Sequence, residues 1–182
     1  MRHRFRSSRR LVCGVALATT VFAVAANTAG AHVDIEPTRA KAGSTTAIVV
    51  SPLNEEDDAG TTKVEVLFPS AYPIASAQVQ DGDDWQAEVS TRTLRKAIKG
   101  SDGKKTRTAV AKITWSGGPS ATEGSFALPA ATIGPLPTNT KQLVFKVVQT
   151  YANGHVDRWI QKSVPGTPEP EFAAPVLRVV RP

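Results

Sequence analysis

The residue best suited to chemistry in this sequence is His32, because of what precedes it. Ala29 and Ala31 stand three residues and one residue before it, the small-residue pattern of a signal-peptidase site. Cleavage after Ala31 would give His32 a free α-amine beside its imidazole. Those two nitrogens can close a chelate ring on a metal, and Cu(II) favours nitrogen ligands in a tetragonal arrangement. The spacing therefore makes His32 a candidate copper(II) ligand, and the alternative is an ordinary solvated terminal histidine.

The segment before His32 has the composition of a secretory signal peptide. Residues 2–10 carry five arginines and no acidic residue, and residues 11–26 are almost wholly apolar or small. This run is short for a membrane span, which needs about 20 residues. We therefore predict that residues 1–31 are removed and that the mature protein is secreted or lies in the periplasm or cell envelope.

Two other cleavage positions stay open. Cleavage after Ala29 would leave Gly30-Ala31-His32, a copper site that uses backbone amides in place of the terminal amine. Cleavage after Ala26 would leave His32 too far inside the chain for either kind of site.

Removal of residues 1–31 changes what the charge implies. The whole sequence has 22 basic and 16 acidic residues, and five of the basic ones lie in the signal segment. Residues 32–182 carry a net charge of only +1, which gives no argument for nucleic acid as a partner. Cys13 and Met1 are the only sulfur-containing residues and leave with the signal, so Cys-based zinc sites and sulfur-ligated Cu(I) sites are excluded from the mature chain.

A carboxylate from the segment at residues 52–58 could complete the copper site, although such acidic segments are more often solvated loops. The sequence alone does not select Glu55 over Glu56, and the spacing fits no EF-hand loop. There is no Gly-x-Ser-x-Gly elbow, HExxH helix or P-loop. These absences give no support to hydrolase or nucleotide-binding chemistry.

An aromatic residue and a second histidine are further candidates. The Asn153-Gly154 pair is a strong hairpin signal, because both residues tolerate positive φ. It places Trp159 on a strand near one end of the fold, where an indole could cover a bound cation. His155, directly after the turn, is expected to be an exposed strand residue and would matter only as a second copper ligand.

The elements that must position these residues are short β-strands separated by turn residues. Many short strands in one domain predict an all-β, immunoglobulin-like or cupredoxin-like β-sandwich. We expect this domain to span residues 32–163, followed by a Pro-rich tail at 164–182 with no C-terminal membrane anchor. The expected strands are 33–36, 45–50, 62–68, 75–79, 85–93, 106–115, 125–131, 142–151 and 155–162, with a last one at 176–180.

The order of short motifs across residues 32–162 resembles the YcnI-like copper-binding family. These motifs include Ala31-His32-Val33, Ala42-Gly43-Ser44, Asn54-Glu55, Thr114-Trp115 and Tyr151-Ala152-Asn153-Gly154 up to Trp159. The resemblance implies a β-sandwich outside the membrane that binds one Cu(II) per chain through a monohistidine brace.

On the matching positions, the resemblance implies that His32 gives its amine and imidazole, Glu55 the carboxylate and Trp159 the indole beside the metal. It also implies a role in copper acquisition or trafficking, with a copper importer or a Cu(I) chaperone as partner. Many relatives carry a C-terminal transmembrane helix, which has no counterpart in this sequence.

Three functions follow from these observations. The first, which we expect, is a copper carrier or metallochaperone outside the cytoplasm without enzymatic activity. The second is a copper-dependent redox enzyme, which needs an open coordination position and usually a second histidine, for which His155 is the only candidate. The third is a metal-free structural or adhesive sandwich domain.

Overall fold

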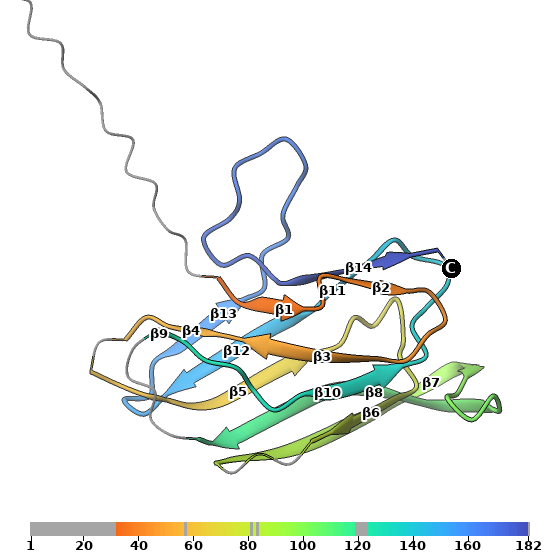
Figure 1. Cartoon of the computed structure of the whole chain (residues 1–182), viewed down its shortest axis with the longest axis horizontal. Helices are drawn as coiled ribbons and strands as arrows, with labels where there is room; N and C mark the ends of the chain where they lie inside the picture. The colour runs from red at the N-terminus through yellow and green to blue at the C-terminus, as the bar shows by residue number, and fades with distance from the viewer. Residues whose placement is uncertain (1–31, 57, 81, 83, 119–123, 182) are drawn as a thin grey trace, which may run out of the picture.

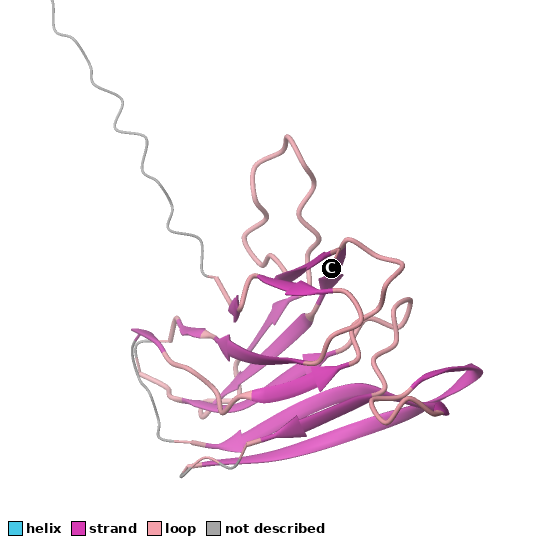
Figure 2. Ribbon diagram, turned by 45° about the vertical axis from the view of Figure 1, so that its right-hand side comes forward, coloured by secondary structure: helices cyan, strands magenta, loops and turns pink. Residues whose placement is uncertain are grey.

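This computed structural model describes residues 32–181 without 57, 81, 83 and 119–123. In these described residues the regular structure consists of fourteen β-strands. The expected signal peptide, residues 1–31, lies outside them. The strands pack in layers (Figures 1 and 2), so the expected all-β sandwich is confirmed. The described part of the chain contains no helix with the length and hydrophobicity needed to cross a bilayer.

The strands have the following bounds: β1 Asp34–Glu36, β2 Arg39–Lys41, β3 Thr46–Ser51, β4 Leu53–Asn54, β5 Thr61–Leu67, β6 Ser76–Val79, β7 Trp85–Lys99, β8 Lys105–Gly117, β9 Gly124–Ser125, β10 Ala131–Gly134, β11 Gln142–Val144, β12 Lys146–Tyr151, β13 Val156–Trp159 and β14 Val176–Val180.

One layer is an antiparallel five-stranded sheet in the order β13-β12-β5-β8-β7. Its central strand β5 shows how the sequence sets the two faces. Val64 and Val66 are fully buried, whereas Lys63 and Glu65 point away from the core. This alternation follows from the two-residue period of a strand.

The other layer combines a four-stranded sheet, β1-β3-β10-β6, with a three-stranded sheet, β11-β14-β2. A small pair, β4 with β9, lies at one end. Ile48 and Val50 of β3 and Ile133 of β10 join Val66 and Ile113 of the first layer in one buried core. The core therefore lies between the layers.

The chain changes layers at Phe145, so the single strand expected at 142–151 is in fact two. Before it, β11 pairs with β14, and after it, β12 pairs with β5 and β13. Phe145 itself is fully buried, and its backbone N–H donates to the carbonyl of Pro175. The sequence pattern does not reveal this switch, because buried and more exposed residues alternate without a break from β11 into β12.

The last strand forms as expected and belongs to the core. β14 pairs antiparallel with β11 and parallel with β2. Leu177 is fully buried in the same core cluster as the residues of β3 and β5. This strand lies within the Pro-rich segment 164–182, in which the sequence allowed for one last strand.

The strand expected at 125–131 is wrong. Only Gly124–Ser125 and, further on, Ala131–Gly134 are strands. Leu128 still donates its N–H to Val50, but Pro129 has no amide hydrogen to continue the ladder.

The hairpin of β7 and β8 is longer than the sequence predicted. β5 pairs only with Lys112–Ser116 of β8, so the remainder of the hairpin continues as a two-stranded ribbon. The ribbon extends beyond the sandwich at the right of Figure 1. At its turn, Gly103 adopts φ +80° and the N–H of Gly100 donates to the carbonyl of Lys104 over 2.7 Å.

Candidate metal centre

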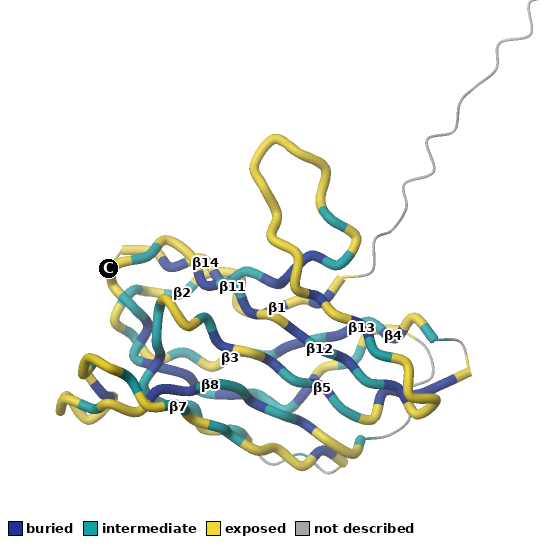
Figure 3. Tube along the Cα trace, turned by 180° about the vertical axis from the view of Figure 1, so that it is seen from behind, coloured by how far each residue is buried: buried dark blue, intermediate teal, exposed yellow. Residues whose placement is uncertain are grey.

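His32 lies just before β1 and is exposed at the surface. Its Nε2 is 3.2 Å from Oε2 of Glu169, which belongs to the connection between β13 and β14. That connection is exposed over most of its length (Figure 3). Together with β1 it borders a shallow pocket of about 170 Å³ that His32, Ser163, Glu169 and Ala173 help to line. A segment distant in sequence therefore meets the expected mature N-terminus.

Glu55 is exposed in the connection between β4 and β5. Burial raises the pKa of its carboxyl group, and the negative charges of Asp157 and Glu171 raise it further. The charge of His32 acts in the opposite direction and lowers that pKa. The fold thus brings His32 and Glu55 within interaction range of each other, together with two further acidic residues.

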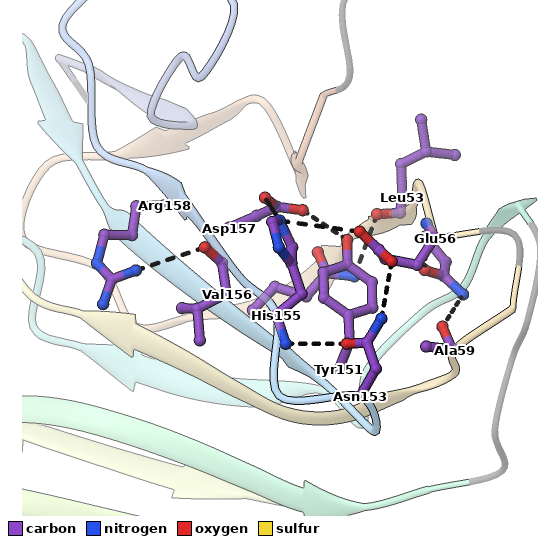
Figure 4. A network of polar contacts seen from close by, with 11 residues as sticks. Leu53, Glu56, Ala59, Tyr151, Asn153, His155, Val156, Asp157 and Arg158 are labelled. Atoms are coloured by element: carbon purple, nitrogen blue, oxygen red, sulfur yellow. Dashed lines mark hydrogen bonds and ion pairs between the residues drawn. The ribbon is translucent and has the colours of Figure 1, made fainter.

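The structure distinguishes Glu55 from Glu56, which the sequence could not. Glu56 accepts a hydrogen bond at Oε2 from Nδ2 of Asn153 over 2.9 Å, and its Oε1 lies 3.8 Å from Nε2 of His155. Its backbone N–H donates to Oδ1 of Asn54. Glu56 therefore fastens the loop to the β12–β13 hairpin (Figure 4), whereas the charges around Glu55 include that of His32.

A polar network of Tyr151, Asp157 and His155 lies next to the loop that carries Glu55. The Tyr151 hydroxyl donates to Oδ2 of Asp157 over 2.8 Å, and Nε2 of His155 lies 3.0 Å from Oδ1 of the same carboxylate (Figure 4). Burial, followed by the interaction with Asp157, raises the pKa of Tyr151. A hydrogen bond between the backbone of Glu55 and Tyr151 opposes this rise. Tyr151 thereby connects the Glu55 loop to β13.

The residues that sequence reasoning missed are Asp157, Glu169, Glu171 and Tyr151. Asp157 had a detectable signal, since it alternates with Trp159 on the inward face of β13, and a buried carboxylate requires partners. Glu169 and Glu171 had none, because they stand in a Pro-rich segment whose path is set by distant strands.

Trp159 is fully buried, and its ring packs against Phe172 with centroids 5.2 Å apart. Among the described residues its indole Nε1 has no hydrogen-bond partner, which is uncommon for a buried donor. An indole N–H can donate but cannot ligate a cation, so only its π face could act on a metal.

His155 contacts Asp157 and Glu56 rather than His32. Across the described residues, no three His, Cys, Asp or Glu side chains are arranged as a metal-binding group. A monohistidine brace requires only two side chains, because the α-amine of the histidine is its third ligand. The residues at this end, His32 and Glu55, therefore fit the donor set of such a site.

Comparison with known proteins identifies the domain. A family described as a domain of unknown function, DUF1775, matches residues 32–179. The crystal structure of an uncharacterized protein from Nocardia farcinica, described as an immunoglobulin-like fold, is similar at 25% identity and a TM-score of 0.63, covering 81% of this chain and 97% of that one. The expected immunoglobulin-like architecture is thereby confirmed.

Another similar structure is a cohesin module from a family 33 glycoside hydrolase of Clostridium perfringens. It is 7% identical over 83% of this chain and 97% of that one, with a TM-score of 0.44, and this likeness supports no functional argument. No curated protein matches the chain. The match over residues 32–179 shows that this chain belongs to the DUF1775 domain family.

Proposed function

We propose that this protein binds one Cu(II) ion outside the cytoplasm and carries it to or from a partner. After removal of residues 1–31, the amine and imidazole of His32 would hold the ion, with Glu55 as the carboxylate ligand. The observation that carries the proposal is the contact of His32 Nε2 with Oε2 of Glu169 over 3.2 Å, with Glu55 near enough for the charge of His32 to lower its pKa.

Glu169 supports the proposal through the covalent geometry of histidine. The α-amine lies closer along the chain of bonds to Nδ1 than to Nε2, so chelation by both groups of one residue uses Nδ1. Nε2 of His32 is then left to donate to Oε2 of Glu169, 3.2 Å away. Metal-bound histidines usually donate their second ring N–H to a carboxylate or carbonyl, which fixes the tautomer and orients the ring.

Electrostatics also favour a cation at this end. Besides burial, the negative charges of Asp157 and Glu171 raise the pKa of Glu55, which means that each of them repels the ionised Glu55 carboxylate. A divalent cation would relieve this repulsion. When bound there, Cu(II) would supply a positive charge held by nitrogen and oxygen ligands, as its ligand preferences require.

The contacts of His155 favour a carrier over a redox enzyme. A histidine committed to Asp157 and Glu56 contributes to the supporting network, and a second copper-ligating histidine is then missing from the proposed donor set. Trp159, buried against Phe172, would act only as a neighbouring aromatic face. A copper importer or a Cu(I) chaperone is the partner we propose.

The deciding experiment is calorimetric titration of Cu(II) into the protein that begins at His32 and into the same protein with Ala31 retained. We expect one ion per chain for the first and loss of that binding for the second, because the extension converts the amine to an amide. His32→Ala should abolish the site, with His155→Ala as its matched control. Equal affinity with and without Ala31 would rule out the brace.

The acidic positions provide a second matched set. Glu55→Gln should weaken binding, whereas Glu56→Gln should leave it near the wild-type value. Glu169→Gln should lower the affinity by about 10–100-fold, the range for residues that orient a metal ligand. An intact mass of the exported protein that starts elsewhere than His32 would contradict both the site and the proposed processing.

A further inference from the structure

The long β7–β8 hairpin carries a concentration of positive charge. Residues 92–112, here named the basic hairpin, hold eight lysines and arginines and one acidic residue, Asp102. The rest of residues 32–182 has nine basic and fifteen acidic residues. The near-neutral net charge of the domain therefore conceals a strongly basic hairpin on an otherwise acidic molecule.

Two of these eight cations have partners in the fold. Nη1 of Arg92 donates to the carbonyl of Val110 over 3.0 Å, and Nζ of Lys112 lies 2.5 Å from Oε1 of Glu65. The other six side chains are exposed and, among the described residues, form no ion pair with an acidic side chain. These six are Arg95, Lys96, Lys99, Lys104, Lys105 and Arg107.

The register of the hairpin places like charges side by side. Lys99 is the direct cross-strand partner of Lys105 next to the turn. Like charges directly opposite each other destabilise an antiparallel pair. Asp102, the one acidic residue, accepts a hydrogen bond at Oδ1 from the backbone N–H of Lys104 and so acts in the turn. The charge pattern therefore destabilises the pairing of β7 with β8 and is not explained by the stability of the hairpin.

The basic hairpin and the candidate metal centre lie at opposite ends of the molecule. In Figure 1 the ribbon of β7 and β8 extends to the right, whereas the connection after β4, which carries Glu55, forms the left end. Glu55, Glu56, Asp157, Glu169 and Glu171 all belong to the acidic remainder. The cations of the basic hairpin therefore lie at the opposite end of the longest axis from the loop that carries Glu55.

We propose that the basic hairpin binds an anionic lipid surface and holds the loop that carries Glu55 away from it. The six cations are distributed over both strands and the turn of a projecting ribbon, which suits a diffuse layer of negative charge. No aromatic residue occurs between residues 86 and 114, so a stacking platform for nucleic-acid bases is missing there. Lysines and arginines next to an anionic bilayer are attracted by its negative surface potential.

The test is sedimentation of the mature protein, without added metal, with vesicles of equal parts phosphatidylglycerol and phosphatidylcholine. A variant with Lys99, Lys104 and Lys105 all changed to Gln is compared with a control in which Lys41, Lys141 and Lys146 are changed to Gln. The six positions are all exposed, so both variants lose the same charge from the surface. Because no metal is added, failure of the copper proposal would not affect the result.

We expect the wild type to bind these vesicles and not pure phosphatidylcholine, and to be released by high salt. The hairpin variant should lose on the order of a hundredfold in affinity, since each cation near an anionic surface contributes about fivefold. The control variant should lose less than about fivefold. Thermal unfolding should show the hairpin variant at least as stable as the wild type, because Lys99 and Lys105 no longer repel each other.

Three results would overturn the proposal. An equal loss of vesicle affinity in both triple variants would show that binding depends on the net charge of the protein and not on the hairpin. Tighter binding to polyglutamate than to the vesicles at equal charge would make an acidic polypeptide the partner. Aggregation of the hairpin variant with unchanged vesicle binding would assign these charges to protection of the exposed strand edge.

Discussion

Tyr151→Phe tests whether the network below the candidate metal centre stabilises the domain. The substitution removes one oxygen atom and keeps the aromatic ring, so the packing of the buried side chain is preserved. The lost group is the hydroxyl that donates to Oδ2 of Asp157 over 2.8 Å. Asp157 is itself 8% exposed, so water can replace the missing donor only in part.

The expected magnitude follows from these contacts. A hydrogen bond to a charged group contributes about 1.5–3 kcal/mol. Asp157 keeps His155, 3.0 Å from Oδ1, and this remaining partner places the expected loss near the middle of that range. We expect the free energy of unfolding to fall by about 2 kcal/mol, which corresponds to a decrease in Tm of roughly 6 °C for a domain of this size.

Urea unfolding followed by tryptophan fluorescence measures this change. Tyr72→Phe is the matched control, because Tyr72 is the other tyrosine of the chain and its hydroxyl makes no hydrogen bond in the described structure. The control should stay within about 0.5 kcal/mol of the wild type. Equal stability of the two variants would refute the assigned role of the Tyr151 hydroxyl.

Two further predictions concern the sandwich itself. Leu177→Ala in β14 should lower the free energy of unfolding by about 2–5 kcal/mol, since the side chain is fully buried. The control Val164→Ala, at a 54% exposed position, should leave the free energy of unfolding nearly unchanged. Equal effects of the two substitutions in chemical denaturation would show that β14 does not contribute to the core. The hydrogen bond from Lys112 lowers the pKa of Glu65 from its ordinary value of 4.5, so the stability that it contributes is present above that value and is lost as the pH falls through the lowered pKa. Lys112→Gln should therefore reduce stability by less than about 1 kcal/mol at neutral pH and by nothing in strong acid, and a deficit that persists in acid unfolding curves would show a non-electrostatic cause.

The sequence predicts local features of this fold well, because periodicity and turn chemistry act over a few residues. The alternation in β5 and the Asn153-Gly154 turn before β13 are examples, and both appear in the structure. Local signals fail where distant partners decide. The division of β11 from β12 at Phe145 depends on which sheet each half joins, and that choice leaves no mark in the pattern.

The same distinction applies to the candidate metal centre. His32 stands out from its position behind Ala31, and Glu55 was one of two equal choices in an acidic run. The approach of Glu169 to His32 results from the path between β13 and β14, so it requires the completed fold. The metal-binding role of His32, Glu55 and Trp159 remains a prediction that the titrations above test.

The parallel pairing of β14 with β2 constrains the order in which this chain can fold. Residues 178–180 lie beside residues 39–41, so the sheet that contains them cannot close until almost the whole polypeptide is available. Contacts of such long sequence separation slow folding, because the intervening loop must be ordered first. A nascent chain that has not yet been synthesised through β14 therefore stays open at this sheet until its final strand emerges.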